Sequence, residues 1–243
     1  MGLLAKLRIA RENWWLLLSR PLELDIRRVA GHARGRFLDL GSGNLASRPI
    51  FKDAIGIYVG VDPWLGSPHL SKLQNRSLPR THLVHADGRA LPFLDRSFDT
   101  ILCTQVIEHV PDFWEIFREI DRVAAEGAVL ILSAPQSWFV HGAPNDYYRF
   151  TRYGLRHLAE RAGFEVVLER WQGGPIALAG QAIVNFLDYN VFGRQGPMRW
   201  FSVLIEIACH FLDRVVRPAN ANLDRWDTMN NLLVARRKSP GVS

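Results

Sequence analysis

The sequence predicts an α/β fold with a mostly parallel sheet covered by helices on both faces. Seven apolar runs of strand length occur along the chain, and helical patterns separate most of them. Strands that alternate with helices favour parallel pairing, because a crossover helix returns the chain to the same edge of the sheet. The chain has 243 residues, of which 48% are hydrophobic, which suits one large domain with a sizeable core.

The predicted strands are short apolar runs, several of which end in glycine or an acidic residue. In chain order they are RFLDLGSGN from Arg36, GIYVGVD from Gly56, HLVHAD from His82, FDTILCTQV from Phe98, AVLILSAP from Ala128, FEVVLERW from Phe164 and NLLVARRK from Asn231. Most of these runs are nearly continuous rather than alternating, which indicates strands that are buried on both faces.

Helical patterns lie between these runs. Apolar residues at three- and four-residue steps predict a first helix over residues 3–18. A second helix begins after Pro111, where Asp112 and Glu115 have the spacing of a capping box, and Gly127 can close it. A third begins near Thr151 and stops at Gly163.

We expect a single domain over residues 1–243, with two further helices between the sixth and seventh strands. Their apolar patterns cover residues 176–192 and 200–216 and are too apolar to lie free in water. A lid over the site, an extension of the core and a contact with a membrane are three open roles for them. The parts of the domain are an N-terminal helical extension, a cofactor-binding core, a helical insertion and a last strand, at residues 1–30, 36–171, 172–222 and 228–238.

The net charge is +6, and residues 1–36 hold eight Lys or Arg against three acidic residues. A basic segment fits nucleic acid, anionic lipid or an acidic substrate, and a solvated helix face explains it equally well. Because the basic residues gather at the N-terminus, away from the strand ends, a nucleic-acid partner is not expected. Peripheral contact with a membrane stays open.

Export and membrane crossing are not expected. The first twenty residues are charged too often for a signal peptide, and no run reaches the roughly 20 apolar residues that span a bilayer. Cys103 and Cys209 lie far apart, so neither a disulfide framework nor a metal site is predicted. We expect a cytoplasmic protein, with a location at the inner membrane as the open variant.

Glycines and acidic residues follow the first three strands. In an open parallel sheet, ligands bind outside the carboxyl ends of the strands. Gly41 and Gly43 permit a tight turn that a ligand can approach closely. Asp62 lies 19 residues after Gly43, where a carboxylate can accept hydrogen bonds from both hydroxyls of a ribose. Asp87 can accept from the exocyclic amine of adenine, so together these residues predict an adenosine site.

A dinucleotide is the rival ligand. Counting from Gly41, the third position of the dinucleotide fingerprint holds Ala46, which the looser form of that fingerprint tolerates. Pro49 argues against a long helix aimed at a diphosphate, so adenosine without a diphosphate is favoured. A nicotinamide-dependent oxidoreductase stays an alternative, although no Tyr is followed by Lys four residues later, as its short-chain version requires.

The stretches FLDLGSG, YVGVD, HADGRALPFLDRSFDTILCTQVIEHVPD and REIDRVAAEGAVLILSAP resemble the successive motifs of class I S-adenosylmethionine-dependent methyltransferases of type 11. The resemblance covers residues 36–171 and the last strand. It implies a Rossmann-like seven-stranded sheet of order 3-2-1-4-5-7-6, with the last strand antiparallel. The motif HGAPNDYYRFT resembles a bacterial subgroup that is associated with polysaccharide or other cell-surface biosynthesis.

The resemblance also implies which residues bind S-adenosylmethionine. The expected cofactor-binding residues are Asp39, Gly41, Ser42, Gly43, Asp62, Pro63, Asp87, Gly88 and Gln105. The family often has a glycine where this chain has Leu45, which is a departure next to the expected contacts of the methionine carboxylate.

The segment from His141 to Thr151 follows the fifth strand, where the methyl acceptor must lie. His141 is the first candidate for a general base, because an unshifted imidazole titrates near pH ~6.5, and His109 is its rival. Asp146 could orient His141 or contact the acceptor. The expected acceptor-binding residues are Tyr147, Tyr148 and Arg149. The alternative is a loop that satisfies its own hydrogen bonds, with Asp146 paired to Arg149.

The leading function is therefore S-adenosylmethionine-dependent O-methylation of a small-molecule, sugar or lipid-linked acceptor. The alternatives are the oxidoreductase and a non-catalytic module that binds an adenosine cofactor or a membrane surface.

Overall fold

The computed structural model describes residues 15–65, 79–187, 191, 199–216 and 227–238. The chain divides into two compact units, and each is described by itself. The larger unit consists of Asp25–Arg170 and Asn231–Ser243, and the smaller of Met1–Leu24 and Trp171–Asn230. The single domain expected over residues 1–243 stays a prediction.

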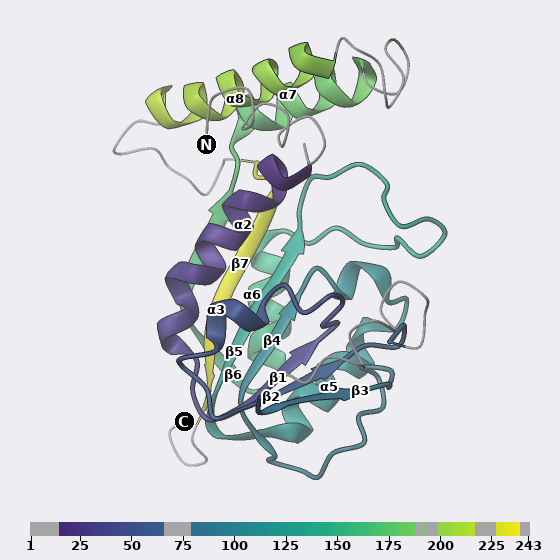
Figure 1. The fold of residues 1–243 in the computed structure, drawn as a ribbon, viewed down its shortest axis with the longest axis vertical. Helices are drawn as coiled ribbons and strands as arrows, with labels where there is room; N and C mark the ends of the chain where they lie inside the picture. The colour runs from purple at the N-terminus through teal and green to yellow at the C-terminus, as the bar shows by residue number, and fades with distance from the viewer. Residues whose placement is uncertain (1–14, 66–78, 188–190, 192–198, 217–226, 239–243) are drawn as a thin grey trace. The chain divides into compact units, whose positions relative to one another are not determined.

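One seven-stranded sheet runs through the protein in the order β3-β2-β1-β4-β5-β7-β6. The strands are β1 (Arg36–Leu40), β2 (Ile57–Val61), β3 (Thr81–Val84), β4 (Phe98–Thr104), β5 (Ala124–Pro135), β6 (Phe164–Gln172) and β7 (Asn230–Arg237). β3, β2, β1, β4 and β5 pair in parallel, and β7 enters between β5 and β6 in the opposite direction (Figure 1). The predicted strand order is confirmed.

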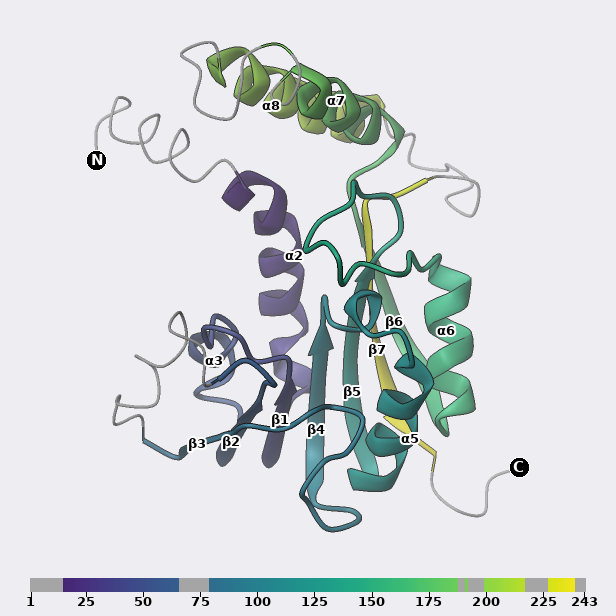
Figure 2. The same ribbon diagram turned by 90° about the vertical axis from the view of Figure 1, so that its right-hand side faces the viewer.

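The central strands are buried because helices cover both faces of the sheet. α5 (Phe113–Val123) and α6 (Arg152–Arg161) lie on one face (Figure 2). The short helix α3 (Arg48–Phe51) and the last turns of α2 (Trp15–Val29) lie on the other. Four of the five residues of β1 and five of the seven of β4 are buried, so nearly continuous apolar runs were the correct signal for these strands.

The predicted start of the second helix is confirmed, but its side-chain cap and its end differ from the prediction. Asp112 is the N-cap residue of α5, but its side chain makes no capping hydrogen bond and instead accepts from Arg89 Nη1 at 3.3 Å. Gly127 does not close this helix, which ends at Val123. Gly127 has a φ of 64° and lies within β5, beside the register shift between β4 and β5. The bulge, rather than a helix end, explains this glycine.

The remaining short helices are the 3₁₀ turns η1 (Ala30–His32) and η2 (Ile107–His109). α3 has only four residues, which agrees with the short helix expected from Pro49. Most of the first helix expected over residues 3–18 lies outside the described residues, and α2 continues through Pro21 to Val29.

The smaller unit contains α7 (Pro175–Phe186) and α8 (Arg199–Val216), where the apolar patterns predicted two helices. The two helices pack closely at Gly180, because a Cβ there would lie 2.5 Å from Cys209 Sγ. Asp213 of α8 caps α7 by accepting hydrogen bonds from Gly174 N at 2.8 Å and Ala177 N at 2.8 Å. Among the described residues, no helix is long and apolar enough to cross a membrane.

Candidate functional site

A pocket of about 700 Å³ lies at the carboxyl ends of β1, β2 and β4. Six predicted cofactor-binding residues line it, namely Gly41, Asp62, Pro63, Asp87, Gly88 and Gln105. Two predicted acceptor-side residues, His109 and Tyr147, line it as well. The topology alone explains this grouping, because the carboxyl ends of parallel strands meet at one edge of the sheet.

Gly41 forms the turn that leaves β1. Its φ is 70°, a conformation that favours glycine, and a Cβ there would lie 2.4 Å from Val106 Cγ2. The backbone N–H groups of Gly41 and Ser42 both donate to the Val61 carbonyl, at 2.8 Å and 3.0 Å. These bonds tie the turn to the end of β2.

Asp62 is held in one orientation at the end of β2. Gly43 N donates to its Oδ2 at 3.0 Å, and Trp64 N donates to its Oδ1 at 2.8 Å. The residue is buried yet lines the pocket. A carboxylate oxygen has two lone-pair directions, so each oxygen can accept one further hydrogen bond. The exposed ring of Trp64 lies beside it on the pocket wall and was not predicted from the sequence.

Asp39, Ser42 and Gly43 are not on the pocket wall. The Asp39 carboxylate is buried behind the Gly41 turn and accepts a hydrogen bond from the Tyr58 hydroxyl. Burial raises the pKa of Asp39 to about 7, the Tyr58 hydrogen bond opposes this shift, and the nearby Asp62 charge adds to it. The Asp39 carboxylate is therefore held in the core by Tyr58, and a direct contact of these three residues with a cofactor stays a prediction.

Asp87 forms a bidentate ion pair with Arg89. Arg89 Nε lies 3.1 Å from Asp87 Oδ1, and Arg89 Nη2 lies 2.8 Å from Asp87 Oδ2. The hydrogen bonds from Arg89 lower the pKa of Asp87, against the effect of partial burial. The ion pair fixes an ionised carboxylate at the rim of the pocket.

Gln105 has a left-handed backbone conformation, with a φ of 56°. Its N–H donates to the Ser133 carbonyl at 3.0 Å, and its side-chain amide donates to Ser133 Oγ at 3.2 Å. A non-glycine residue in this region costs energy and persists only where the surroundings enforce it, and such residues gather at functional sites. Gln105 lies on the pocket wall, and its contact with a cofactor stays a prediction.

The loop from His141 to Thr151 satisfies most of its own polar groups. Arg149 donates to the Asp146 carboxylate at 2.6 Å and 2.8 Å and to the Phe139 carbonyl at 2.9 Å. Asp146 Oδ2 also accepts from His141 N at 2.7 Å, and the Arg149 hydrogen bonds hold the pKa of Asp146 well below its usual range. Asp146, Tyr148 and Arg149 do not line the pocket. The self-bonded alternative describes these contacts better than direct contact with an acceptor.

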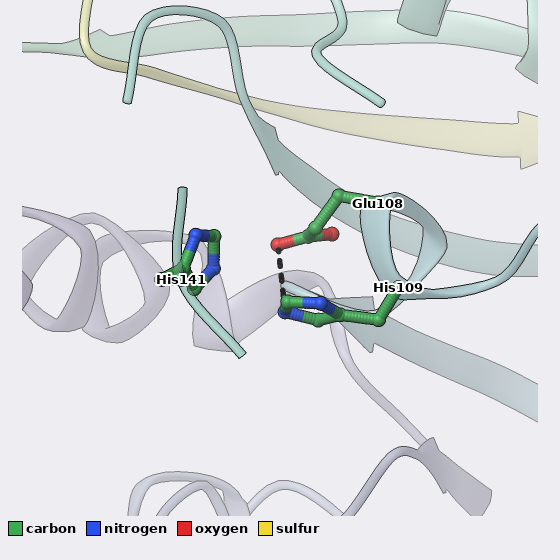
Figure 3. Close-up of side chains that lie close together, drawn as sticks. All are labelled: Glu108, His109 and His141. Carbon is green, nitrogen blue, oxygen red and sulfur yellow. Dashed lines mark ion pairs between the residues drawn. The ribbon is translucent and has the colours of Figure 1, made fainter. Parts of the chain in front are cut away.

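Glu108, His109 and His141 lie together beside the pocket (Figure 3). The His109 and His141 rings meet edge to face with centroids 4.8 Å apart, and His109 Nε2 lies 3.9 Å from Glu108 Oε1. His109 lines the pocket, whereas His141 does not. Burial lowers the pKa of His141, mainly by removing water from the ring, so this imidazole is largely neutral at pH 7.

Glu108 was not predicted as a site residue. The 3₁₀ turn η2 directs its carboxylate into the protein, where burial raises its pKa to about 8 and the Arg149 charge lowers it in part. The available signal was a charged residue immediately after an apolar run, in the stretch TQVIEHV. Such a residue is more often exposed, and its burial follows from the turn and not from the pattern.

Comparison with known proteins supports the fold. Residues 38–132 match the family model described as a methyltransferase domain. The chain has the methyltransferase fold. An uncharacterised methyltransferase of Mycobacteroides abscessus is 40% identical over 103 residues, which are 41% of this chain and 40% of that protein. A similar protein of Mycobacterium tuberculosis is 38% identical over 96 residues, or 40% and 37% of the two chains. The chain thus matches about two fifths of the length of these curated relatives.

Solved structures with the same fold have low sequence identity. The Burkholderia thailandensis 1,6-didemethyltoxoflavin-N1-methyltransferase, solved with bound 1,6-didemethyltoxoflavin and S-adenosylhomocysteine, aligns with a TM-score of 0.56 at 15% identity. The alignment covers 98% of this chain and 92% of that one. The [4+2]-cyclase SpnF aligns with a TM-score of 0.55 at 18% identity, over 88% and 80% of the two chains. At such identities the likeness concerns the fold alone.

Proposed function

We propose that this protein transfers a methyl group from S-adenosylmethionine to an oxygen atom of a small-molecule, sugar or lipid-linked acceptor. The observation that carries the proposal is the Asp62 carboxylate, which two backbone N–H groups hold on the pocket wall next to the Gly41 turn. The matched methyltransferase family over residues 38–132 supports the same reading.

The residues of the pocket fit the cofactor. Gly41 and Gly88 leave room for close approach, and Asp62 has lone pairs for two ribose hydroxyls. Trp64 provides an aromatic wall and Asp87 a fixed acceptor at the rim, which suit an adenine ring with its amine. A volume of about 700 Å³ lies within the range of sites for molecules of this size.

S-adenosylmethionine supplies, when bound, a methyl group that its sulfonium already activates. The chain must then align the acceptor oxygen and, for a hydroxyl, remove its proton. Glu108, His109 and His141 are the titratable side chains that gather beside the pocket, and their presence favours oxygen as the methylated atom. Tyr147 also lines this side of the pocket and is the remaining candidate of the acceptor-binding set.

The rival functions are less well supported. A dinucleotide needs a helix that directs its N-terminus at the diphosphate, and α3 has only four residues. Leu45 has a φ of 63° where the methyltransferase family often has glycine, so the turn keeps the backbone conformation that favours glycine. A non-catalytic module on this fold is the second alternative, and only turnover separates it from an enzyme.

Replacement of Asp62 by Ala tests the cofactor site. The change removes the acceptor for two ribose hydroxyls, and hydrogen bonds to a charged group are worth about 1.5–3 kcal/mol. We expect the affinity for S-adenosylhomocysteine in calorimetry to fall roughly ten- to a hundredfold. Asp53→Ala, which changes an exposed aspartate away from the pocket, should bind like the wild type.

Circular dichroism must show that the Asp62→Ala protein is folded. Unchanged affinity in that protein would contradict the site assignment. Tight binding of NADH with no binding of S-adenosylhomocysteine would instead favour the oxidoreductase.

A further inference from the structure

We propose that Glu108, His109 and His141 bind a divalent transition-metal ion at the edge of the pocket. One atom from each side chain, a carboxylate oxygen and two imidazole nitrogens, lies within 4.8 Å of the others (Figure 3). Metal binding is inferred from these three residues and their neighbours alone. The role of the ion in methyl transfer rests on the proposed function.

The Glu108 carboxylate is the first reason for this inference. The residue is fully buried, and neither of its oxygens has a hydrogen bond to another residue among those that the structure describes. Buried carboxylates normally have hydrogen bonds, ion pairs or metal ions as partners, because desolvation of an unpaired charge is costly. The ionisable neighbour of this carboxylate is His109, whose Nε2 lies 3.9 Å from Oε1, too far for a hydrogen bond.

The hydrogen bond of His109 is the second reason. Its Nδ1 lies 2.6 Å from the Asn145 carbonyl oxygen, which can only accept, so Nδ1 carries the proton. The lone pair of the neutral ring then resides on Nε2, the atom that faces Glu108. Metal-binding histidines have this arrangement, with the second nitrogen donating to a carbonyl or carboxylate.

His141 has the same type of outer contact. Its Nδ1 lies 3.3 Å from the Phe139 carbonyl oxygen and 3.5 Å from Asp146 Oδ2. Both neighbours are acceptors and favour a proton on Nδ1, which leaves the lone pair on Nε2. Arg149 holds Asp146 in place, so the Asp146–Arg149 ion pair would fix the orientation of His141 as a metal ligand.

The spacing of the three side chains requires a small adjustment. Ligand atoms lie about 2.0–2.2 Å from a zinc ion, so two of them lie roughly 3–4 Å apart. His141 is on a loop, and rotation of its imidazole can bring its nitrogen to this distance from the other two ligand atoms. Gly142 leaves space beside the ligands, because a Cβ there would lie 3.3 Å from His109 Cε1.

The donor set indicates the class of ion. Two imidazoles and one carboxylate suit Zn²⁺, Fe²⁺, Co²⁺ or Mn²⁺, whereas Mg²⁺ and Ca²⁺ prefer oxygen ligands. Three protein ligands leave positions for an acceptor oxygen, as in catalytic zinc sites. An ion that binds the acceptor hydroxyl lowers its pKa, and the proton passes to solvent. The oxygen then forms its bond to the methyl carbon while the carbon–sulfur bond breaks and leaves its electron pair on sulfur.

Metal binding to the whole protein tests the site without any assay of methyl transfer. After removal of metals with a chelator, the wild type should bind one equivalent of Zn²⁺ or Co²⁺ in equilibrium dialysis, and Co²⁺ should give the visible absorption of a bound ion. Glu108→Gln and His141→Ala should each weaken binding more than the roughly 10–100-fold that loss of an outer partner costs. His157→Ala, an exposed histidine on α6, is the matched control and should bind like the wild type.

Two results would overturn the proposal. One is the absence of stoichiometric binding by the wild type. The other is equal binding by the wild type and by folded Glu108→Gln and His141→Ala proteins, in which case Glu108 is a buried neutral acid. Binding of Co²⁺ by a protein that fails to bind S-adenosylhomocysteine would retain the metal site and contradict the proposed function, so the two failures are distinguishable.

Discussion

Asp39 couples the folded state to pH at the scale of a single residue. Its folded pKa of about 7 exceeds the ordinary value of 3.8, mainly because the carboxyl is buried. Between these two values the folded state holds a proton that the unfolded state has lost. The free energy of unfolding must therefore fall as pH rises from about 4 to about 7, with a slope of up to ~1.4 kcal/mol per pH unit from this group, and level off above that.

Asp39→Asn isolates this effect, because the amide cannot titrate but can still accept from the Tyr58 hydroxyl. We expect the stability of the wild type relative to Asp39→Asn, measured by urea unfolding between pH 4.5 and pH 8, to decline with rising pH. A difference that stays constant over this range would mean that Asp39 is already ionised in the folded state at low pH.

The sequence predicts well which residues come together where the strand ends decide their position. Gly41, Asp62 and Asp87 follow three neighbouring strands, so strand order alone brings them to one pocket. Glu108 could not be predicted, because its burial depends on the direction of a three-residue turn. For Arg149 the sequence left two alternatives open, a methyl acceptor and the internal Asp146. A guanidinium can bind either one, so the residue type alone does not decide between them.

At the scale of elements, α6 shows a helix start that the sequence predicts and the structure explains. Thr151 is the N-cap residue, and its side-chain oxygen accepts from Gly154 N at 3.1 Å. α5 has an equally good pattern in Asp112 and Glu115, but Arg89 attracts the Asp112 carboxylate away from the helix end. Local patterns cannot reveal such a partner, because it comes from a different part of the chain.

Thr151→Ala should lower the free energy of unfolding by about 1 kcal/mol, because an N–H in the first turn of α6 loses its acceptor. Thr151→Ser retains the hydroxyl and should be close to the wild type. Urea unfolding of the three proteins at one pH measures both values. Equal losses in the Ala and Ser proteins would show that the methyl group of Thr151, and not its cap, carries the effect.

At the scale of the whole molecule, the division into two units was not predicted, and the smaller unit has an unusual distribution of side chains. The α8 residues that pack towards α7 include Cys209 and the buried Asp213. The opposite face exposes large apolar side chains, each more than half accessible, at Phe201, Leu204, Ile207, Phe211 and Val215. This apolar face of α8 is the reverse of what a helix on a soluble surface presents.

We expect this apolar face to bind the surface of an anionic membrane. An interfacial helix inserts its apolar side among the lipids, and basic residues elsewhere on the chain add attraction to anionic headgroups. The net charge of +6 and the eight Lys or Arg of residues 1–36 provide that attraction. Under the proposed function, a lipid-linked acceptor would explain such a surface.

Co-sedimentation with phosphatidylcholine vesicles, with and without phosphatidylserine and at low and high salt, measures the binding. Burial of one Leu or Phe side chain is worth about 1.5–3 kcal/mol, so replacing Phe201, Leu204 and Phe211 by Ser should lower the partition coefficient by at least roughly tenfold. Leu94→Ser, which removes an exposed leucine from the larger unit, should leave it unchanged. Added salt should weaken the binding of the wild type to anionic vesicles, because it screens the basic residues.

If the wild type binds no vesicles, or the triple variant binds as well as the wild type, the face does not contact lipid. A dimer in solution that the triple variant abolishes would then assign the face to a second copy of the chain.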